Sequence, residues 1–134
     1  MNLVQERFLI TGATGFVGAC LARKLAGLGY EVHLLARPGA DRWRLEGLEG
    51  KLQWHVSDLT EGERVREIVR AVAPTVIYHF ATHGAYPSQT DADRIILTGV
   101  FGTWNLLKAC AAVDYKLLVN IGSSSEYGNI SPRA

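Results

Sequence analysis

The sequence has few cysteines, and this excludes a fold held together by disulfides. Cys20 and Cys110 are the only two cysteines among 134 residues, and they lie far apart within helix-like patterns. Small secreted folds that depend on disulfides carry many more cysteines. We therefore expect two small buried thiols in a reducing compartment, and a cytoplasmic protein.

An excess of charge of one sign and long apolar runs are also missing. Fourteen Lys and Arg residues against 13 Asp and Glu residues give a formal net charge of +1, so we expect no binding to nucleic acid. No apolar run approaches the length that a bilayer requires, and Glu6 and Arg7 interrupt the N-terminus where a signal peptide would be apolar. His79 and His83 have no cysteine or carboxylate partner at the spacing of a metal site. We expect neither membrane contact nor a bound metal.

Short apolar runs alternate with amphipathic stretches along the chain, as in a globular α/β protein. Buried strands are predicted over residues 8–10, 32–36, 52–56, 75–81 and 116–121. Helices are predicted over residues 16–28, 65–72 and 91–112, with a short helix or irregular segment over residues 41–48. The strand runs show no polar–apolar alternation, so both of their faces should be buried. This favours a doubly wound parallel sheet, the Rossmann fold, with strand order 3-2-1-4-5.

The glycine-rich stretch at residues 11–18 is the most informative part of the sequence. It reads Thr-Gly-Ala-Thr-Gly-Phe-Val-Gly and lies between a predicted strand and a predicted helix. Gly12 allows a tight turn, Gly15 lets a pyrophosphate approach the backbone, and Gly18 lets the helix pack closely on the strand. A turn that serves packing alone is the alternative. We expect a dinucleotide at the helix N-terminus, in contact with Gly12, Thr14, Gly15, Phe16, Val17 and Gly18.

This stretch resembles the signature of the extended short-chain dehydrogenases/reductases, the NAD-dependent epimerase/dehydratase family. Residues 78–82, 102–109 and 122–128 resemble further segments of that family, in the same order. The resemblance implies that Asp58 and Leu59 hold the adenine. It also implies that Phe80, Ala81 and Thr82 pass beneath the cofactor.

The last of these segments, Gly-Ser-Ser-Ser-Glu-Tyr-Gly at residues 122–128, contains the candidate catalytic residues. The family's catalytic serine or threonine falls four residues before the tyrosine of this segment, and that position is Ser123. Ser124 is the alternative if the register slips by one. The hydroxyl would hydrogen-bond the substrate oxygen. A serine-rich strand end without chemistry stays open as a third interpretation.

Two departures from the family pattern bear on how much of an enzyme is present. Gly99 stands where the family usually has an asparagine, which leaves the local helix geometry open. No tyrosine is followed four residues later by a lysine, although the family uses such a pair for catalysis. We therefore expect residues 1–134 to be one incomplete NAD(P)-binding domain, the N-terminal part of a protein cut before its substrate-binding part. Such a chain should be inactive by itself.

The residue after the second predicted strand bears on the choice between NAD and NADP. NAD-binding relatives place an acidic residue there, but this chain has Ala36 followed by Arg37. A guanidinium group binds a 2′-phosphate, whereas a carboxylate repels it. We therefore expect NADP as the cofactor, with NAD as the alternative. Arg42 and Arg44 could assist Arg37 in binding the 2′-phosphate. An ordinary solvated arginine is the other interpretation of Arg37.

Several other side chains have structural interpretations beside functional ones. Asp58 or Thr60 could cap the following helix. Glu126 could be an acid or base, or simply solvated. His79 is expected to be a buried core residue. Three tryptophans are expected to pack in the interior: Trp43, Trp54 and Trp104.

Together these observations predict the cofactor-binding part of a nucleotide-sugar epimerase, dehydratase or reductase that works by hydride transfer, with a slight preference for a reductase. The alternative is a non-enzymatic NADP-sensing module. The helix over residues 91–112 is apolar nearly all round, which predicts burial on more than one side. Family members form homodimers through this helix, so a homodimer is expected.

Overall fold

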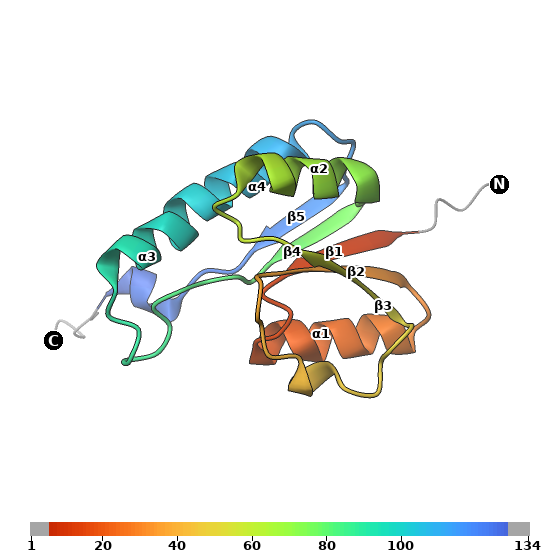
Figure 1. Ribbon diagram of the computed structural model, residues 1–134, viewed down its shortest axis with the longest axis horizontal. Helices are drawn as coiled ribbons and strands as arrows, with labels where there is room; N and C mark the ends of the chain where they lie inside the picture. The colour runs from red at the N-terminus through yellow and green to blue at the C-terminus, as the bar shows by residue number, and fades with distance from the viewer. Residues whose placement is uncertain (1–5, 129–134) are drawn as a thin grey trace, which may run out of the picture.

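Five parallel strands form one sheet in the computed structural model, which describes residues 6–128. The strands are β1 (Arg7–Thr11), β2 (Glu31–Ala36), β3 (Leu52–Val56), β4 (Val76–His79) and β5 (Leu117–Asn120). Their order in the sheet is β3-β2-β1-β4-β5, and each neighbouring pair is parallel (Figure 1). The predicted doubly wound fold and strand order are confirmed.

Helices cover both faces of this sheet. On one face lie α1 (Phe16–Gly27) and the short 3-10 helix η1 (Trp43–Leu45) (Figure 1). On the other lie α2 (Gly62–Val72) and a long helical segment made of α3 (Ala92–Ile96), η2 (Leu97–Gly102) and α4 (Thr103–Cys110). A last 3-10 helix, η3 (Ser124–Tyr127), follows β5. Helices on both faces bury the apolar strands without disulfides.

The hydrophobic core is divided between the two faces of the sheet. Phe8 and Ile10 of β1 point to the α1 side, where they pack with Ala22 and Leu25. Leu9, from the same strand, packs on the other side with α2 and α4. Burial of both faces is therefore confirmed for the central strands. It is wrong for the two edge strands, since β3 leaves Val56 44% exposed and β5 leaves Leu117 48% exposed.

The helix predicted over residues 91–112 contains a π-helical turn. This turn, η2, includes Gly99, the position where the family usually has an asparagine. Glycine is a poor helix former, and single π turns often mark functional sites. A distortion therefore occurs here without the asparagine.

Only one side of this long helical segment is buried. Leu106, Ala109 and Cys110 are buried in the cluster that also contains the apolar side chains of α2. Phe101 and Val100 are more than half exposed. The expectation that this helix is buried on more than one side is therefore wrong for the chain by itself.

Three expectations about interior residues are also wrong, each because of helix periodicity or loop position. Cys20 is exposed, since the buried face of α1 is formed by neighbours such as Ala19 and Ala22. Trp43 and Trp104 are 55% and 58% exposed, respectively. The tryptophan of β3 does pack against the core, as expected.

Within residues 6–128 no helix has the length and apolar character needed to cross a membrane. The same residues contain no group of three or more His, Cys, Asp or Glu side chains arranged to hold a metal ion.

Candidate functional site: a dinucleotide cavity at the carboxyl edge of the sheet

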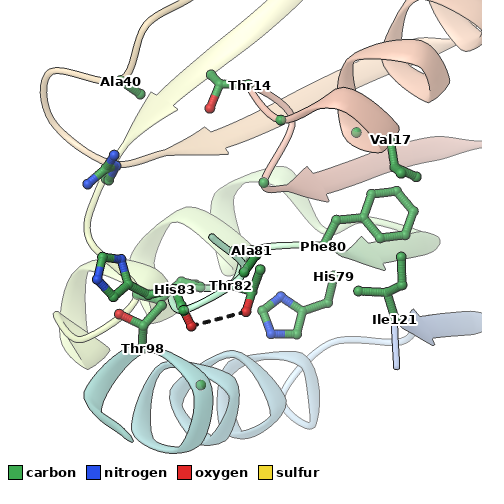
Figure 2. Close-up of a pocket in the computed structure, with 18 of the residues that line it drawn as sticks. Thr14, Val17, Ala40, His79, Phe80, Ala81, Thr82, His83, Thr98 and Ile121 are labelled. Carbon is green, nitrogen blue, oxygen red and sulfur yellow. Dashed lines mark hydrogen bonds between the residues drawn. The ribbon is translucent and has the colours of Figure 1, made fainter. Parts of the chain in front are cut away.

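A cavity of about 910 Å³ opens where the strands end. Because all five strands are parallel, their carboxyl ends meet at one edge, and ligands of doubly wound folds bind there. Thirteen of the fourteen predicted site residues line this cavity: Gly12, Thr14, Gly15, Phe16, Val17, Gly18, Arg37, Asp58, Leu59, Phe80, Ala81, Thr82 and Ser123. Ser124 does not line it. Figure 2 shows Thr14 and Ala40 on one side of the cavity and Val17 and Ile121 on another.

The glycine turn, residues 11–18, forms the floor of the cavity at the start of α1. Gly12 has a φ of +69°, and an added Cβ would lie 2.5 Å from the carbonyl carbon of Phe80. An added Cβ on Gly18 would lie 2.4 Å from the carbonyl oxygen of Gly12. These two glycines are therefore required by the packing of β1, β4 and α1. At Gly15 the nearest such contact is 3.3 Å, so this position has more room than the other two.

The backbone N–H groups at the start of α1 are available to an anion. Gly15 is the N-cap residue and provides no side-chain cap. The first α-helical hydrogen bond runs from Ala19 N to Gly15 O at 3.0 Å, so the N–H groups of Phe16, Val17 and Gly18 precede it. With the positive end of the helix dipole, these groups suit a phosphate.

Asp58 follows β3 and directs one carboxylate oxygen into a local turn. Its Oδ1 accepts hydrogen bonds from Thr60 N at 3.0 Å and Thr60 Oγ1 at 2.8 Å. The backbone N–H of Thr60 contributes most to lowering the pKa of Asp58, and Arg94 and Arg37 add to this. Oδ2 lies 3.8 Å from the Arg94 guanidinium. Asp58 is thus a charged acceptor on the cavity wall.

Neither Asp58 nor Thr60 caps the next helix, as the structural interpretation supposed. The helix α2 begins at Gly62, its N-cap residue is Glu61, and no side chain caps it. Instead, the Glu61 carboxylate turns back and accepts a hydrogen bond from Asp58 N at 3.0 Å. The side chain of Asp58 therefore orders the turn between β3 and α2.

Arginine side chains surround the same side of the cavity. Arg37 follows β2 directly and is exposed on the cavity wall. Arg44 also lines the cavity, and its Nη1 donates a hydrogen bond to Thr14 O at 3.3 Å. Its guanidinium lies 4.3 Å from the centre of the Trp43 ring. Arg42, in contrast, lies over Trp54 and does not line the cavity.

His79 at the end of β4 is buried and hydrogen-bonded on both ring nitrogens. Its Nδ1 lies 2.6 Å from Thr11 Oγ1, and its Nε2 lies 2.9 Å from Thr103 Oγ1. Burial lowers the pKa of His79 to about 4, so the imidazole is neutral at neutral pH. The expectation of a core histidine is confirmed, but its ring also lines the cavity, near Ile121 in Figure 2.

Ser123 lines the cavity and is also the N-cap residue of η3. Its Oγ accepts a hydrogen bond from Ser125 N at 3.2 Å, while Glu126 Oε1 accepts one from Ser123 N at 2.8 Å. This reciprocal pair is a capping box. The position of Glu126 is therefore explained by helix capping. The pattern Ser-x-x-Glu in the sequence could have indicated it.

A loop over residues 82–90 closes the cavity beyond β4. The Gln89 carboxamide oxygen accepts hydrogen bonds from Gly84 N at 3.0 Å and Tyr86 N at 3.2 Å. Gln89 Nε2 also lies 3.4 Å from His83 Nδ1. The Gln89 side chain thus stabilises the conformation of this loop. His83 and Tyr86 of the loop line the cavity.

Sequence reasoning missed several residues that line this cavity. They are Ser57, Arg94, Thr98, Asn120, Trp43 and Thr103. Ser57 could have been found because it directly follows a predicted strand, and Asn120 because it lies one residue before the end of one. Nothing in the sequence indicates Arg94 or Thr98, since their placement depends on how the long helical segment crosses the strand ends.

The sequence model of the NAD dependent epimerase/dehydratase family matches residues 8–133. This chain belongs to that family. The human GDP-mannose 4,6 dehydratase is 31% identical over 136 residues, covering 91% of this chain and 37% of that protein. The chain therefore spans little more than a third of this relative.

Solved structures with the same arrangement contain NAD. The Bordetella bronchiseptica enzyme WbmG in complex with NAD superposes with a TM-score of 0.82 at 25% identity, covering 95% of this chain and 40% of that one. A second structure of WbmG, with NAD and UDP, gives a TM-score of 0.74 at 26% identity and covers 85% and 36%. The UDP-glucose 4-epimerase from Brucella ovis in complex with NAD gives 0.80 at 26% identity and covers 94% and 38%. A nicotinamide dinucleotide is therefore the cofactor class that this family membership supports.

Proposed function

We propose that residues 1–134 form the NAD(P)-binding domain of an epimerase, dehydratase or reductase that acts on a nucleotide-linked sugar by hydride transfer. The observation that carries this proposal is the single cavity wall that joins the glycine turn to the ends of the four later strands. The names of some relatives support the substrate class, since one is a GDP-mannose 4,6 dehydratase and another a UDP-glucose 4-epimerase, and WbmG was solved with UDP. Other relatives are named as a dihydroflavonol 4-reductase and a tetraketide alpha-pyrone reductase. None of these relatives is a sensor, so the alternative of a non-enzymatic NADP-sensing module has no support among them.

In the proposed binding mode, the dinucleotide lies across the carboxyl edge of the sheet. Its pyrophosphate accepts hydrogen bonds from the first N–H groups of α1, where Gly15 leaves room. Asp58 accepts a hydrogen bond from the adenine amino group, with Leu59 beside it. Phe80, Ala81 and Thr82 form the wall beneath the nicotinamide half.

Two arginines favour NADP over NAD. In this binding mode Arg37 lies next to the adenine ribose, which carries the 2′-phosphate of NADP. No acidic residue ends β2. Arg44 is anchored to the glycine turn through Thr14 O, so its charge stays near the same ribose. A 2′-phosphate between two guanidinium groups would gain charge-assisted hydrogen bonds.

The bound nicotinamide would accept or donate the hydride, and the chain would orient the substrate oxygen. Ser123 suits this orienting role, because its Oγ accepts from Ser125 N and leaves its own proton free to donate into the cavity. Ser124 lies off the cavity and is not proposed for this role. A positioned hydrogen bond of this kind lowers the cost of moving the hydroxyl proton.

A homodimer through α3, η2 and α4 is part of the proposal. Leu97, Val100, Phe101 and Trp104 are each about half exposed or more. Exposed apolar side chains gathered along one helical segment usually mark an interaction surface. A cytoplasmic location stays a prediction.

The first test is titration of NADPH and NADH into the protein. Binding is measured from the change in nicotinamide fluorescence. We expect saturable binding of both, tighter for NADPH. Turnover is then assayed with NADPH and a panel of nucleotide-linked keto sugars on the complete gene product. Lack of binding of either dinucleotide at millimolar concentration would overturn the proposal.

A further inference from the structure

A chain of hydrogen bonds runs beneath the cavity and joins β1, β4 and α4. It begins at the backbone N–H of Ala81, which donates to Thr11 Oγ1 at 3.2 Å. It continues from Thr11 Oγ1 to His79 Nδ1 at 2.6 Å and from His79 Nε2 to Thr103 Oγ1 at 2.9 Å. The proposed function gives His79 no task, although both of its ring nitrogens are engaged.

Burial of Thr11 fixes the direction of this chain. The side chain of Thr11 is fully buried, so its hydroxyl proton cannot be donated to bulk water. Its oxygen already accepts the Ala81 N–H, and the only acceptor within reach of its proton among residues 6–128 is His79 Nδ1. An unmade hydrogen bond at such a buried site costs free energy. Thr11 therefore donates, and Nδ1 accepts.

The tautomer of His79 follows from this assignment. A neutral imidazole carries one N–H, and with Nδ1 accepting, that N–H is on Nε2. Nε2 then donates to Thr103 Oγ1. A doubly protonated ring would leave the Thr11 proton without an acceptor, and burial independently keeps the pKa of His79 at about 4.

Thr103 is the open end of the chain. It is half-buried and lines the cavity. Its oxygen accepts from His79, and its own proton has no acceptor among the residues that the structure describes. That proton is therefore free to point into the cavity.

We propose that His79 is a positioning residue that fixes the Thr103 hydroxyl as a hydrogen-bond donor to an oxygen of the bound dinucleotide. This inference rests on the proposed function for the identity of the ligand. The direction of the chain does not depend on it. Because Thr11 belongs to the glycine turn, the same chain also sets the turn, β4 and α4 in one fixed relation beneath the cofactor.

The first experiment reads the tautomer directly, by two-dimensional ¹H–¹⁵N NMR of protein with ¹⁵N-labelled histidine. The chain has four histidines, and the His79 signals are assigned by their loss in His79→Gln or by elimination after replacing His33, His55 and His83. We expect an unprotonated Nδ1 and a protonated Nε2, unchanged from about pH 6 to about pH 8. The opposite tautomer, or titration within that range, would overturn the proposal.

The second experiment measures dissociation constants of NADH and NADPH for two variants of Thr103. Thr103→Ser keeps the hydroxyl and should bind within about twofold of wild type, whereas Thr103→Val should bind about fivefold more weakly, as expected for one lost hydrogen bond. Thr75→Val is the matched control. Thr75 is buried at the opposite end of β4, and its hydroxyl oxygen accepts a hydrogen bond from Arg7 N at 3.0 Å. This control substitution should lower stability without changing either dissociation constant.

The outcomes separate this inference from the proposed function. Equal affinities for Thr103→Val, Thr103→Ser and wild type would overturn the role of Thr103. If wild type binds neither dinucleotide, the proposed function and the ligand named here both fail, whereas the NMR spectra still decide the direction of the chain.

Discussion

The substitution Arg37→Ala should weaken NADPH binding and leave NADH binding nearly unchanged. Arg37 lies on the cavity wall directly after β2, a strand that ends in Ala36 and not in an acidic residue. A charge-assisted hydrogen bond contributes roughly 1.5–3 kcal/mol. Arg37 is exposed, so solvent and salt screen this interaction, and we expect the lower end, about 1.5 kcal/mol, or roughly tenfold in affinity.

The assay is a fluorescence titration of NADPH and NADH into wild type and variant at low and at high salt. The tenfold difference should shrink at high salt, because screening weakens an exposed pair. Arg70→Ala is the control, since Arg70 is an exposed arginine in the last turn of α2, outside the cavity. Arg44→Ala should weaken NADPH binding as well, and the double variant should lose more than either single one. Equal affinities of wild type for the two dinucleotides, unchanged by Arg37→Ala, would refute the reasoning.

Four further outcomes are expected. Gly18→Ala should destabilise the fold by about 3 kcal/mol, because the added Cβ would lie 2.4 Å from a backbone oxygen of the glycine turn. The control Gly27→Ala should not destabilise the fold, because nothing lies within 4 Å of its added Cβ. Thermal unfolding measures both effects. Asp58→Asn should weaken NADPH binding about tenfold. The variant should bind the NADPH analogue with hypoxanthine in place of adenine, which lacks the amino group, no worse than wild type does. Equal losses of affinity for both ligands would contradict this. The pKa of His79 is lowered from 6.5 to about 4 on folding, so the unfolded state binds more protons and stability should fall as the pH drops from 6.5 toward 4. In a His79→Gln variant that folds, the free energy of unfolding, measured with urea, should depend less steeply on pH. Phe101→Lys should abolish self-association in analytical ultracentrifugation if the exposed helical face is the dimer interface; a wild type that is monomeric at high concentration would remove that proposal.

Local chemistry explains which parts of the fold and site could be predicted. The requirement for Gly12 and Gly18 is visible in the sequence, because a strand, a tight turn and a helix follow one another within a few residues. Four of the five strands could be predicted because each contains three consecutive apolar residues, whereas β3 reads Leu-Gln-Trp-His-Val. Ser123 could be placed at a strand end, and its partner Glu126 was recognisable from spacing alone.

Contacts between distant segments explain what could not be predicted. Arg44 reaches the cavity because η1 is held against α1 by Arg23, which donates to Arg44 O at 2.7 Å and to Glu46 O at 2.9 Å. No local pattern encodes that contact. The exposure of Cys20 likewise depends on which side of α1 meets the sheet, and several apolar or small residues compete for that face. Arg94 lies 3.8 Å from Asp58, a contact between α3 and the turn after β3 that no local pattern indicates.

The distribution of charge along the cavity suits a molecule that is anionic at one end and changes charge at the other. Arg37, Arg44 and the N–H groups of α1 gather where the phosphates would lie in the proposed binding mode. Under the other half, the buried imidazole of His79 is neutral and hydrogen-bonded on both sides. Hydride transfer converts a nicotinamide between a cationic and a neutral ring, so a wall that titrated near neutral pH would change its own charge during the reaction. With its pKa near 4, His79 would keep one tautomer in both redox states, so the Thr103 hydroxyl would stay a hydrogen-bond donor to the dinucleotide throughout the cycle.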